Sequence, residues 1–314
     1  MCGVSCAQTN VISVLGEVNT PLKLSSDDIK NMERFHMNKV TLIKEKKRPS
    51  DPEELLSVHN YKGVLLRDIL EKAGMKYVRK WEPGVYFRVK GSGNRQVTFS
   101  FGEIFYSSIG SSVLIAYEKD GKPIAPEDGL GEMIIATDIR AGREIAGVIE
   151  IIVERVDVEM QVYEDRKKNI IRPPTSEFLL IDKKNKKSAN IKLVDLKKMD
   201  SLHIRDVVMT GDCEGFHGIY SFRGVPLRSL LENVGIDPWN QDYNRYVLIY
   251  SENGFSATFS FGEIFNSRLS DNIIIAYEKD GKGLDETEGF ARSAVREDAM
   301  GGRSVKRIYR IEIR

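Results

Sequence analysis

The chain has 314 residues, which is enough for two ordinary domains that each bury a core without disulfides or a structural metal. Its 47 basic residues are balanced by 46 acidic residues, so the charge indicates neither a nucleic-acid partner nor a membrane surface. No apolar run approaches the ~20 residues that span a bilayer. The cysteines are Cys2, Cys6 and Cys213, a pattern that excludes a disulfide framework.

The first residues carry a partial targeting signal. Ser5-Cys6-Ala7 before Gln8 is similar to the small-residue cleavage site of a secretory signal peptide, although no charged and apolar regions precede it. We therefore expect export to the periplasm rather than a cytoplasmic location, with residues 1–9 disordered or removed. The alternative is a flexible tail on a cytoplasmic protein.

The first half of the chain is rich in short strands. A helix capped by Ser26 is predicted to carry Ile29, Met32 and Phe35, and a second helix is predicted from Arg67 to Ala73. Residues 44–52 are basic, contain two prolines and are predicted to form an exposed loop. Strands are predicted where β-branched and aromatic residues gather, over residues 11–15, 40–43, 85–89, 97–99, 113–117, 133–136 and 144–153.

The second half follows the same order after a polar, basic join at residues 161–174, which is predicted to be a stiff linker. Strands are predicted over residues 178–181, 202–209 and 304–313, and residues 191–199 correspond to the first helix. Strands dominate, and the short helices do not follow them in a regular βαβ rhythm. The sequence therefore predicts an α+β fold.

Two stretches are spelled twice at the same offset of 160 residues. Residues 98–105, Thr-Phe-Ser-Phe-Gly-Glu-Ile-Phe, return as residues 258–265, and residues 115–122, Ile-Ala-Tyr-Glu-Lys-Asp-Gly-Lys, return as residues 275–282. Two long identities at one spacing indicate a tandem duplication. We predict one domain over residues 10–160, called copy one, and a second over residues 175–314, called copy two.

The longer repeated stretch predicts the start of a helix. Ser100 followed by Glu103 matches the capping box, in which the two side chains satisfy backbone N–H groups at the helix start. Phe101 and Phe105 lie four residues apart and share one helical face. Glu103 and its counterpart Glu263 are thus interpreted as helix caps, and a pair of catalytic glutamates is the alternative.

The order of motifs resembles the molybdopterin-binding domain of the sulfite oxidase family. The resemblance covers most of both copies, and no single motif would suffice for it. It implies a strand-rich α+β fold with short helices, repeated in tandem. The motifs are a G-E-V opening at residues 16–18, G-V-P-L-R-x-L-L-E-x-x-G at 224–235, F-S-F-G-E-I at 259–264, A-Y-E-K-D-G-K at 276–282 and G-R-S-V-K-R-I at 302–308.

The resemblance also implies a metal ligand. Catalytic members of the family hold molybdenum through the dithiolene of a pterin cofactor and one cysteine thiolate, which precedes the aromatic-x-G-V-P-L segment. Cys213 lies at the matching place, nine residues before Phe222, and is the candidate catalytic residue and metal ligand. The alternative is a small buried side chain, which is the usual role of a lone cysteine.

Basic residues of copy two match the positions that hold the cofactor phosphate in the family. Arg292, Arg303 and Lys306 are the candidates, because charge-assisted hydrogen bonds suit an anionic phosphate. His217, four residues after Cys213, is a further candidate for the same site, with a place on the loop surface as its alternative. Arg303 has a counterpart in copy one, Arg143, which favours a structural role for both.

Copy one departs from the family pattern. It has no cysteine between residues 44 and 61, and it has Glu132 and Ala146 at the positions of Arg292 and Lys306. Copy two keeps the pattern but lacks the extra length and the additional arginine and histidine positions of full catalytic members. Any metal site is therefore expected in copy two only. The four histidines show no pair at the spacing of zinc ligands.

Two functions remain open. The first is a molybdopterin-dependent oxidoreductase of the sulfite oxidase type, which would transfer an oxygen atom or two electrons at a molybdenum-molybdopterin cofactor. The alternative is a non-catalytic, cofactor-free module that binds a ligand or a protein on the same fold. The sequence identifies neither the small-molecule substrate nor a redox partner protein.

Overall fold

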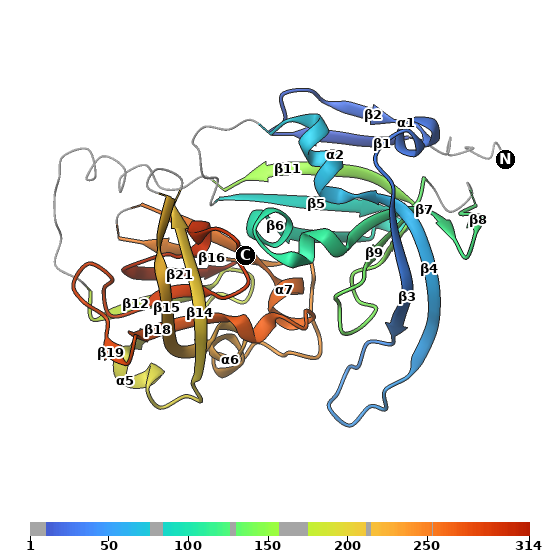
Figure 1. Ribbon diagram of the computed structural model, residues 1–314. Helices are drawn as coiled ribbons and strands as arrows, with labels where there is room; N and C mark the ends of the chain where they lie inside the picture. Colours follow the sequence, from blue (N-terminus) through green and yellow to red (C-terminus); the bar gives the residue numbers. More distant parts are fainter. Residues whose placement is uncertain (1–10, 76–83, 126–129, 157–174, 212–214, 253) are drawn as a thin grey trace.

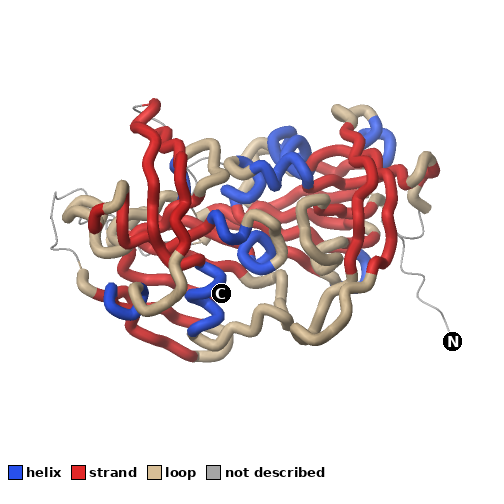
Figure 2. The backbone as a smooth tube through the Cα atoms, turned by 60° about the horizontal axis from the view of Figure 1, so that its bottom comes forward, coloured by secondary structure: helices blue, strands red, loops and turns tan. Residues whose placement is uncertain are grey.

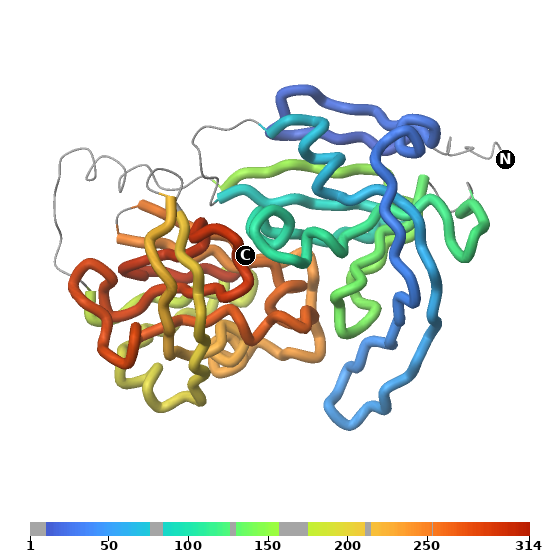
Figure 3. The backbone as a smooth tube through the Cα atoms, viewed as in Figure 1, coloured from blue at the N-terminus to red at the C-terminus, as the bar shows by residue number. Residues whose placement is uncertain are grey.

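The two copies lie side by side and repeat one arrangement of strands and short helices (Figures 1 and 3). The computed structural model describes residues 11–75, 84–125, 130–156, 175–211, 215–252 and 254–314. Figure 2 shows that strands predominate over helices. The α+β prediction, with its short helices, is therefore confirmed.

Copy one contains two sheets. The first has the order β2 (Leu22–Leu24), β1 (Ile12–Gly16), β11 (Val148–Arg155), β5 (Val85–Gly91) and β6 (Gln96–Ser100). The second has the order β10 (Ile145–Ala146), β9 (Glu132–Ile135), β7 (Val113–Lys119), β4 (Leu55–Leu65) and β3 (Phe35–Ile43), and β8 (Lys122–Pro123) also pairs with β7.

Copy two contains the corresponding sheets. The first has the order β13 (Lys187–Lys192), β12 (Glu177–Asp182), β21 (Ile308–Ile313), β16 (Tyr246–Ser251) and β17 (Ser256–Ser260). The second has the order β14 (Leu202–Gly211), β15 (Gly215–Pro226), β18 (Ile273–Lys279) and β19 (Lys282–Gly283), and β20 (Arg292–Val295) also pairs with β18.

The first and last strands of each copy pair in parallel. Val14 of β1 lies opposite Ile151 of β11, and Leu180 of β12 lies opposite Ile311 of β21. All four side chains are buried, and each copy has its own large apolar cluster, because the inward faces of its strands are almost entirely apolar. In each copy, the strand near the start of the copy thus pairs with the strand near its end in one sheet.

Short helices cap the strands. They are α1 (Ser26–Lys30), α2 (Leu66–Ala73) and α3 (Phe101–Phe105) in copy one, and α5 (Leu193–Leu196), α6 (Leu227–Asn233) and α7 (Phe261–Phe265) in copy two. The capping boxes predicted at α3 and α7 are present, with Ser100 and Glu103 in one and Ser260 and Glu263 in the other. Gly74 ends α2 with a φ of 63°, a left-handed conformation that glycine adopts readily.

Several predicted boundaries were wrong. The cap of the first helix is Ser25 rather than Ser26, and the helix predicted over residues 191–199 is limited to α5, because residues 191–192 belong to β13. The first helix ends at Lys30, and Phe35 begins β3, because Phe35 pairs with Gly63 in the β3–β4 ladder and this pairing overrides its helical spacing. The last strand begins at Ile308 rather than at residue 304. Arg307 has a φ of 51°, which interrupts the extended backbone just before it.

The predicted linker at residues 161–174 and the expected processing of residues 1–9 lie outside the described residues. Within the part of the chain that the structure describes, no helix is both long enough and apolar enough to cross a membrane.

Candidate functional site

The strand that leads to Cys213 lies against the last loop of copy two. Cys213 itself lies outside the described residues, between the ends of β14 and β15. Near the end of β14, the Thr210 hydroxyl donates a hydrogen bond to the backbone oxygen of Ala299 over 3.2 Å. The Met209 sulfur lies 3.9 Å from the Ser304 Oγ. The residues just before Cys213 are thereby held beside Ser304.

Arg292 occupies the centre of this region. It lies on β20, is 1% exposed, and stacks its guanidinium over the Phe222 ring with 4.8 Å between the guanidinium carbon and the ring centre. Its Nη1 donates to Glu288, and its Nη2 donates to the Ser304 hydroxyl. Arg292 is therefore fixed by β15, by the segment before β20 and by the loop that carries Ser304.

Glu288 is shared by three cationic side chains. Besides Arg292, the Lys279 Nζ lies 3.4 Å and the Lys306 Nζ 3.3 Å from its carboxylate. Burial acts to raise the pKa of Glu288, but Arg292, Lys306 and Lys279 together hold it below its usual value. The three cations carry more positive charge than the Glu288 carboxylate neutralises. Part of this positive charge lies at the surface, because Lys306 is half-exposed.

The structure thus brings Arg292 and Lys306 together at Glu288, whereas Arg303 and His217 lie elsewhere. The Nε and Nη2 of Arg303 donate to Asp298 over 2.8 and 2.6 Å, and its Nη1 donates to Glu263 over 2.5 Å. Its Nη1 also lies 3.4 Å from the Ser100 Oγ of copy one, so Arg303 lies between the two copies. His217 is exposed on β15, and its backbone oxygen accepts a hydrogen bond from the Tyr220 hydroxyl over 2.7 Å.

Copy one has the opposite charge at the corresponding place. Glu132 stands at the position of Arg292, and Glu144 at that of Ser304. Tyr61 stands at the position of Phe222. Tyr61 pairs with Lys119 just as Phe222 pairs with Lys279. Burial raises the pKa of Glu144 to about 8. Its Oε2 and the Tyr61 hydroxyl have no hydrogen-bond partner among the described residues. Copy one therefore lacks the arginine that copy two has at this place.

The family model for the oxidoreductase molybdopterin-binding domain matches residues 4–153 and again residues 174–314. The chain belongs to the oxidoreductase molybdopterin-binding domain family. The family resemblance of the motifs is thereby confirmed. Among solved structures, the chain is similar to the sulfane dehydrogenase SoxCD from Paracoccus pantotrophus, with 13% identity and a TM-score of 0.36. The alignment covers 93% of this chain and 64% of that one. No curated protein matches the chain significantly.

The donor set of copy two fits the anionic cofactor of the molybdopterin-binding family in its charge. Lys279, Arg292 and Lys306 surround a single carboxylate, and charge-assisted donors of this kind suit a phosphate. The copy-one positions do not fit, because Glu132 places a carboxylate where copy two has Arg292, and Glu144 replaces the serine that helps to fix that arginine. The family match covers both copies, but the chemistry differs between them.

Sequence reasoning missed Glu288 and Ser304, the two groups that fix Arg292. Glu288 is one of several acidic residues at positions 285–288, and nothing in that run distinguishes it from its neighbours. Ser304 directly follows Arg303, and its counterpart in copy one is the glutamate Glu144. Comparison of the two copies at this position was the one available signal, because a change from Ser to Glu reverses what the site can bind.

Proposed function

We propose that the protein is a molybdopterin-dependent oxidoreductase of the sulfite oxidase type, with its metal site in copy two only. Cys213 supplies the thiolate ligand, and Arg292 and Lys306 hold the cofactor phosphate. The molybdenum-pterin group supplies two-electron or oxygen-atom transfer when it is bound. The substrate is a small molecule that reaches the metal.

The observation that carries this proposal is the cationic group around Glu288, beside the strand that leads to Cys213. Lys279, Arg292 and Lys306 converge on this one carboxylate. Asp285 adds a second negative charge that acts on Arg292 and Lys279, but three cations still exceed the two carboxylates, and this positive charge favours an anionic ligand. Thr210 and Met209 link the end of β14 to the same loop, which supports a common site with Cys213.

Each residue has a defined task in this proposal. The Cys213 thiolate is a soft ligand that suits a high-valent metal. Arg292 is held by Glu288 and Ser304, so it presents a fixed charge toward the anion. Lys306 is half-exposed and contributes a mobile charge at the rim. His217, on β15 beyond Cys213, is an accessory group at most, because it is exposed.

Copy one serves as a non-catalytic partner on the same fold in this proposal. Its Glu132 and Glu144 replace the arginine and serine of copy two, and no cysteine occupies the matching segment. This charge reversal is the observation that favours the cofactor-free alternative for copy one.

The test is the molybdenum content of the full chain, purified from a host that makes the cofactor and measured by mass spectrometry of the metal. We expect molybdenum in proportion to the protein. Cys213→Ser should lose the metal while its circular dichroism stays unchanged, since the thiolate is a ligand rather than a packing group. Cys6→Ser is the matched control and should keep the metal.

A second pair of variants tests the phosphate site. The Lys306→Ala variant should retain less cofactor than the Lys282→Ala variant. Of these two lysines, Lys306 is the one that pairs with Glu288, whereas Lys282 is exposed on β19. The pterin released on denaturation can be measured by its fluorescence, a readout that does not require activity. Wild-type protein without molybdenum from the competent host would leave the cofactor-free alternative for both copies.

A further inference from the structure

The longer repeated stretch meets its own counterpart across the contact between the copies. Strand β6 packs against β17, α3 packs against β17, and α7 packs against β6. Tyr86 and Tyr246, which are related by the same 160-residue offset, stack on each other with ring centres 4.5 Å apart. Residues near a two-fold axis contact their own equivalents in this way.

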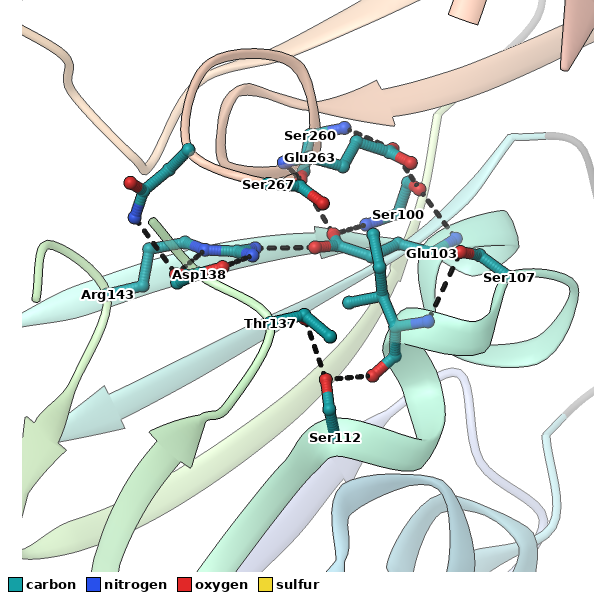
Figure 4. Close-up of polar contacts among 12 residues, drawn as sticks. Ser100, Glu103, Ser107, Ser112, Thr137, Asp138, Arg143, Ser260, Glu263 and Ser267 are labelled. Atoms are coloured by element: carbon teal, nitrogen blue, oxygen red, sulfur yellow. Dashed lines mark hydrogen bonds and ion pairs between the residues drawn. The ribbon is translucent and has the colours of Figure 1, made fainter. Parts of the chain in front are cut away.

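Hydrogen bonds join the helix caps of the two copies (Figure 4). The Ser100 hydroxyl donates to the Glu263 Oε1 over 2.6 Å, and the Ser260 hydroxyl donates to the Glu103 Oε2 over 2.6 Å. Each serine also accepts the N–H of the glutamate in its own helix, over 3.0 Å in both copies. Each capping box is complete within its own helix, and a serine hydroxyl from the other copy adds a hydrogen bond to its glutamate.

Two arginines complete the same reciprocal pattern. Arg143 donates to Asp138 and Glu103 of copy one, and Arg303 donates to Asp298 and Glu263 of copy two. All six side chains are almost fully buried. Every buried charge in this group therefore has an opposite charge beside it, which a buried ion pair requires.

Glycines make room for these arginines in the opposite copy. A Cβ atom at Gly102 would overlap the side chain of Arg303, and a Cβ atom at Gly262 would overlap the guanidinium of Arg143. The arginine of each copy thus lies on the helix of the other.

Hydrogen bonds to backbone groups also cross between the copies. The Ile139 N–H donates to the Asn266 oxygen over 2.7 Å, and the equivalent Ala299 N–H donates to the Tyr106 oxygen over 2.8 Å. The hydroxyl of Thr258 in copy two donates to the Val85 oxygen over 2.9 Å. A bond from one copy is repeated from the other, as an isologous interface requires.

From these contacts we infer that the face around residues 98–106 and 137–143, with its equivalent at residues 258–266 and 297–303, is self-complementary. Its partner is a second copy of the same fold. The two copies hold together through this face without help from the segment that connects them. This inference is independent of the proposed cofactor.

The experiment is to cut the connection in the folded, full-length protein. A protease site replaces part of residues 161–170, between the two family matches, and the purified chain is cleaved under native conditions. The two fragments should elute together in size-exclusion chromatography at the volume of the uncut chain. Elution as two separate fragments would overturn the inference.

Reciprocity gives a second, sharper test. In the cleaved protein, Ser100→Ala and Ser260→Ala should each raise the dissociation constant of the fragments by about tenfold, since each removes one charge-assisted hydrogen bond across the interface. The increases in the dissociation constant caused by the two variants should agree within about threefold, because the strength of one such hydrogen bond varies with its context by that much. A measurable effect from only one serine would contradict self-complementarity.

A steric variant provides the matched comparison. Gly102→Leu should separate the cleaved fragments because its side chain takes the place of Arg303. Gly283→Ala should leave them together, because a Cβ atom there meets nothing within 4 Å. If Gly102→Leu does not fold, the serine variants still decide the question.

Discussion

Glu144 shows how a single side chain changes the chemistry of copy one. It occupies the position of Ser304 and has a buried Oε2 without a hydrogen-bond partner among the described residues. Burial raises its pKa to about 8, whereas a glutamate in the unfolded chain titrates near ~4.3. The folded protein therefore holds a proton there at neutral pH that the unfolded chain releases.

This difference predicts the pH dependence of stability. Because the pKa of Glu144 is raised in the folded state, its contribution is fully present below pH ~4.3 and is lost as the pH rises toward about 8. Glu144→Gln should remove this loss. At pH 8 the variant should be more stable than the wild type by about 2 kcal/mol, a figure reduced for the partial exposure of the side chain.

Urea unfolding between pH 5 and 9 measures this effect as the difference between the variant and the wild type. The exposed Glu33→Gln is the control and should give a flat difference across the same range. A flat difference for Glu144→Gln as well would show that the carboxylate is not desolvated.

At the residue scale, the sequence predicted the positions of the basic side chains in copy two but not their partners. Arg292 and Lys306 meet at Glu288, while Arg303, from the same closing motif, is turned into the contact between the copies. Motif spacing places residues along the chain only. The direction in which a side chain points depends on the loop that carries it, and that loop is set by tertiary contacts.

Helices α3 and α7 are too short to be stable by propensity alone, since one or two turns do not repay the cost of nucleation. Their stability comes from capping and from contacts with the other copy. Ser100 caps α3 and also donates to Glu263 of copy two, whereas Ser25 caps α1 through Asp28 of the same helix at an exposed site.

The two serines should therefore respond differently to the same change. Ser25→Ala should cost about 1 kcal/mol, the usual value of an N-cap. Ser100→Ala should cost about 3 kcal/mol, because it also leaves a buried carboxylate oxygen short of a donor. Denaturant unfolding of both variants measures the difference. Equal costs would show that the bond between the copies adds nothing.

At the scale of elements, the sequence predicted most strands, and the missed boundaries have local causes. Alternation and β-branching determine which segments are extended, so β1, β5, β7 and β11 were predicted closely. Strand β3 was predicted too short, over residues 40–43, and β4 was not predicted, because both depend on long-range pairing, as between Phe35 and Gly63. No local pattern carries that information.

The whole molecule should unfold as one unit. Separating the copies would break the serine–carboxylate bonds between them and would expose the buried arginines and carboxylates of both copies to solvent, so neither copy keeps this region intact after the other unfolds. Calorimetry should show a single transition, with the calorimetric enthalpy equal to the van't Hoff enthalpy. Two resolved transitions in the wild-type protein would contradict this coupling.

Arg303→Leu tests the source of the coupling. It leaves Glu263 and Asp298 buried without their cation, which should cost about 3 to 5 kcal/mol. Arg223→Leu is the control, because Arg223 pairs with Glu278 at an exposed site and such pairs contribute about 0 to 1 kcal/mol. The melting temperature of each variant measures the two costs.

At the largest scale, the sequence revealed two related copies but not how they meet. The repeated letters were interpreted as a helix start within each copy, which is correct, yet the same letters also form the contact between the copies. Identity at one offset shows common origin. It does not show which identical residues face each other, because that depends on the packing of sheet edges.

The overlap of each arginine with a glycine of the other copy has a consequence for how the gene can change. A codon for a larger residue at position 102 is tolerated only if position 303 first acquires a smaller side chain, and the same holds for positions 262 and 143. Each such pair therefore needs two substitutions in the same gene, and the arginine must change before the glycine. Changes at these four positions are therefore coupled in pairs across the two copies.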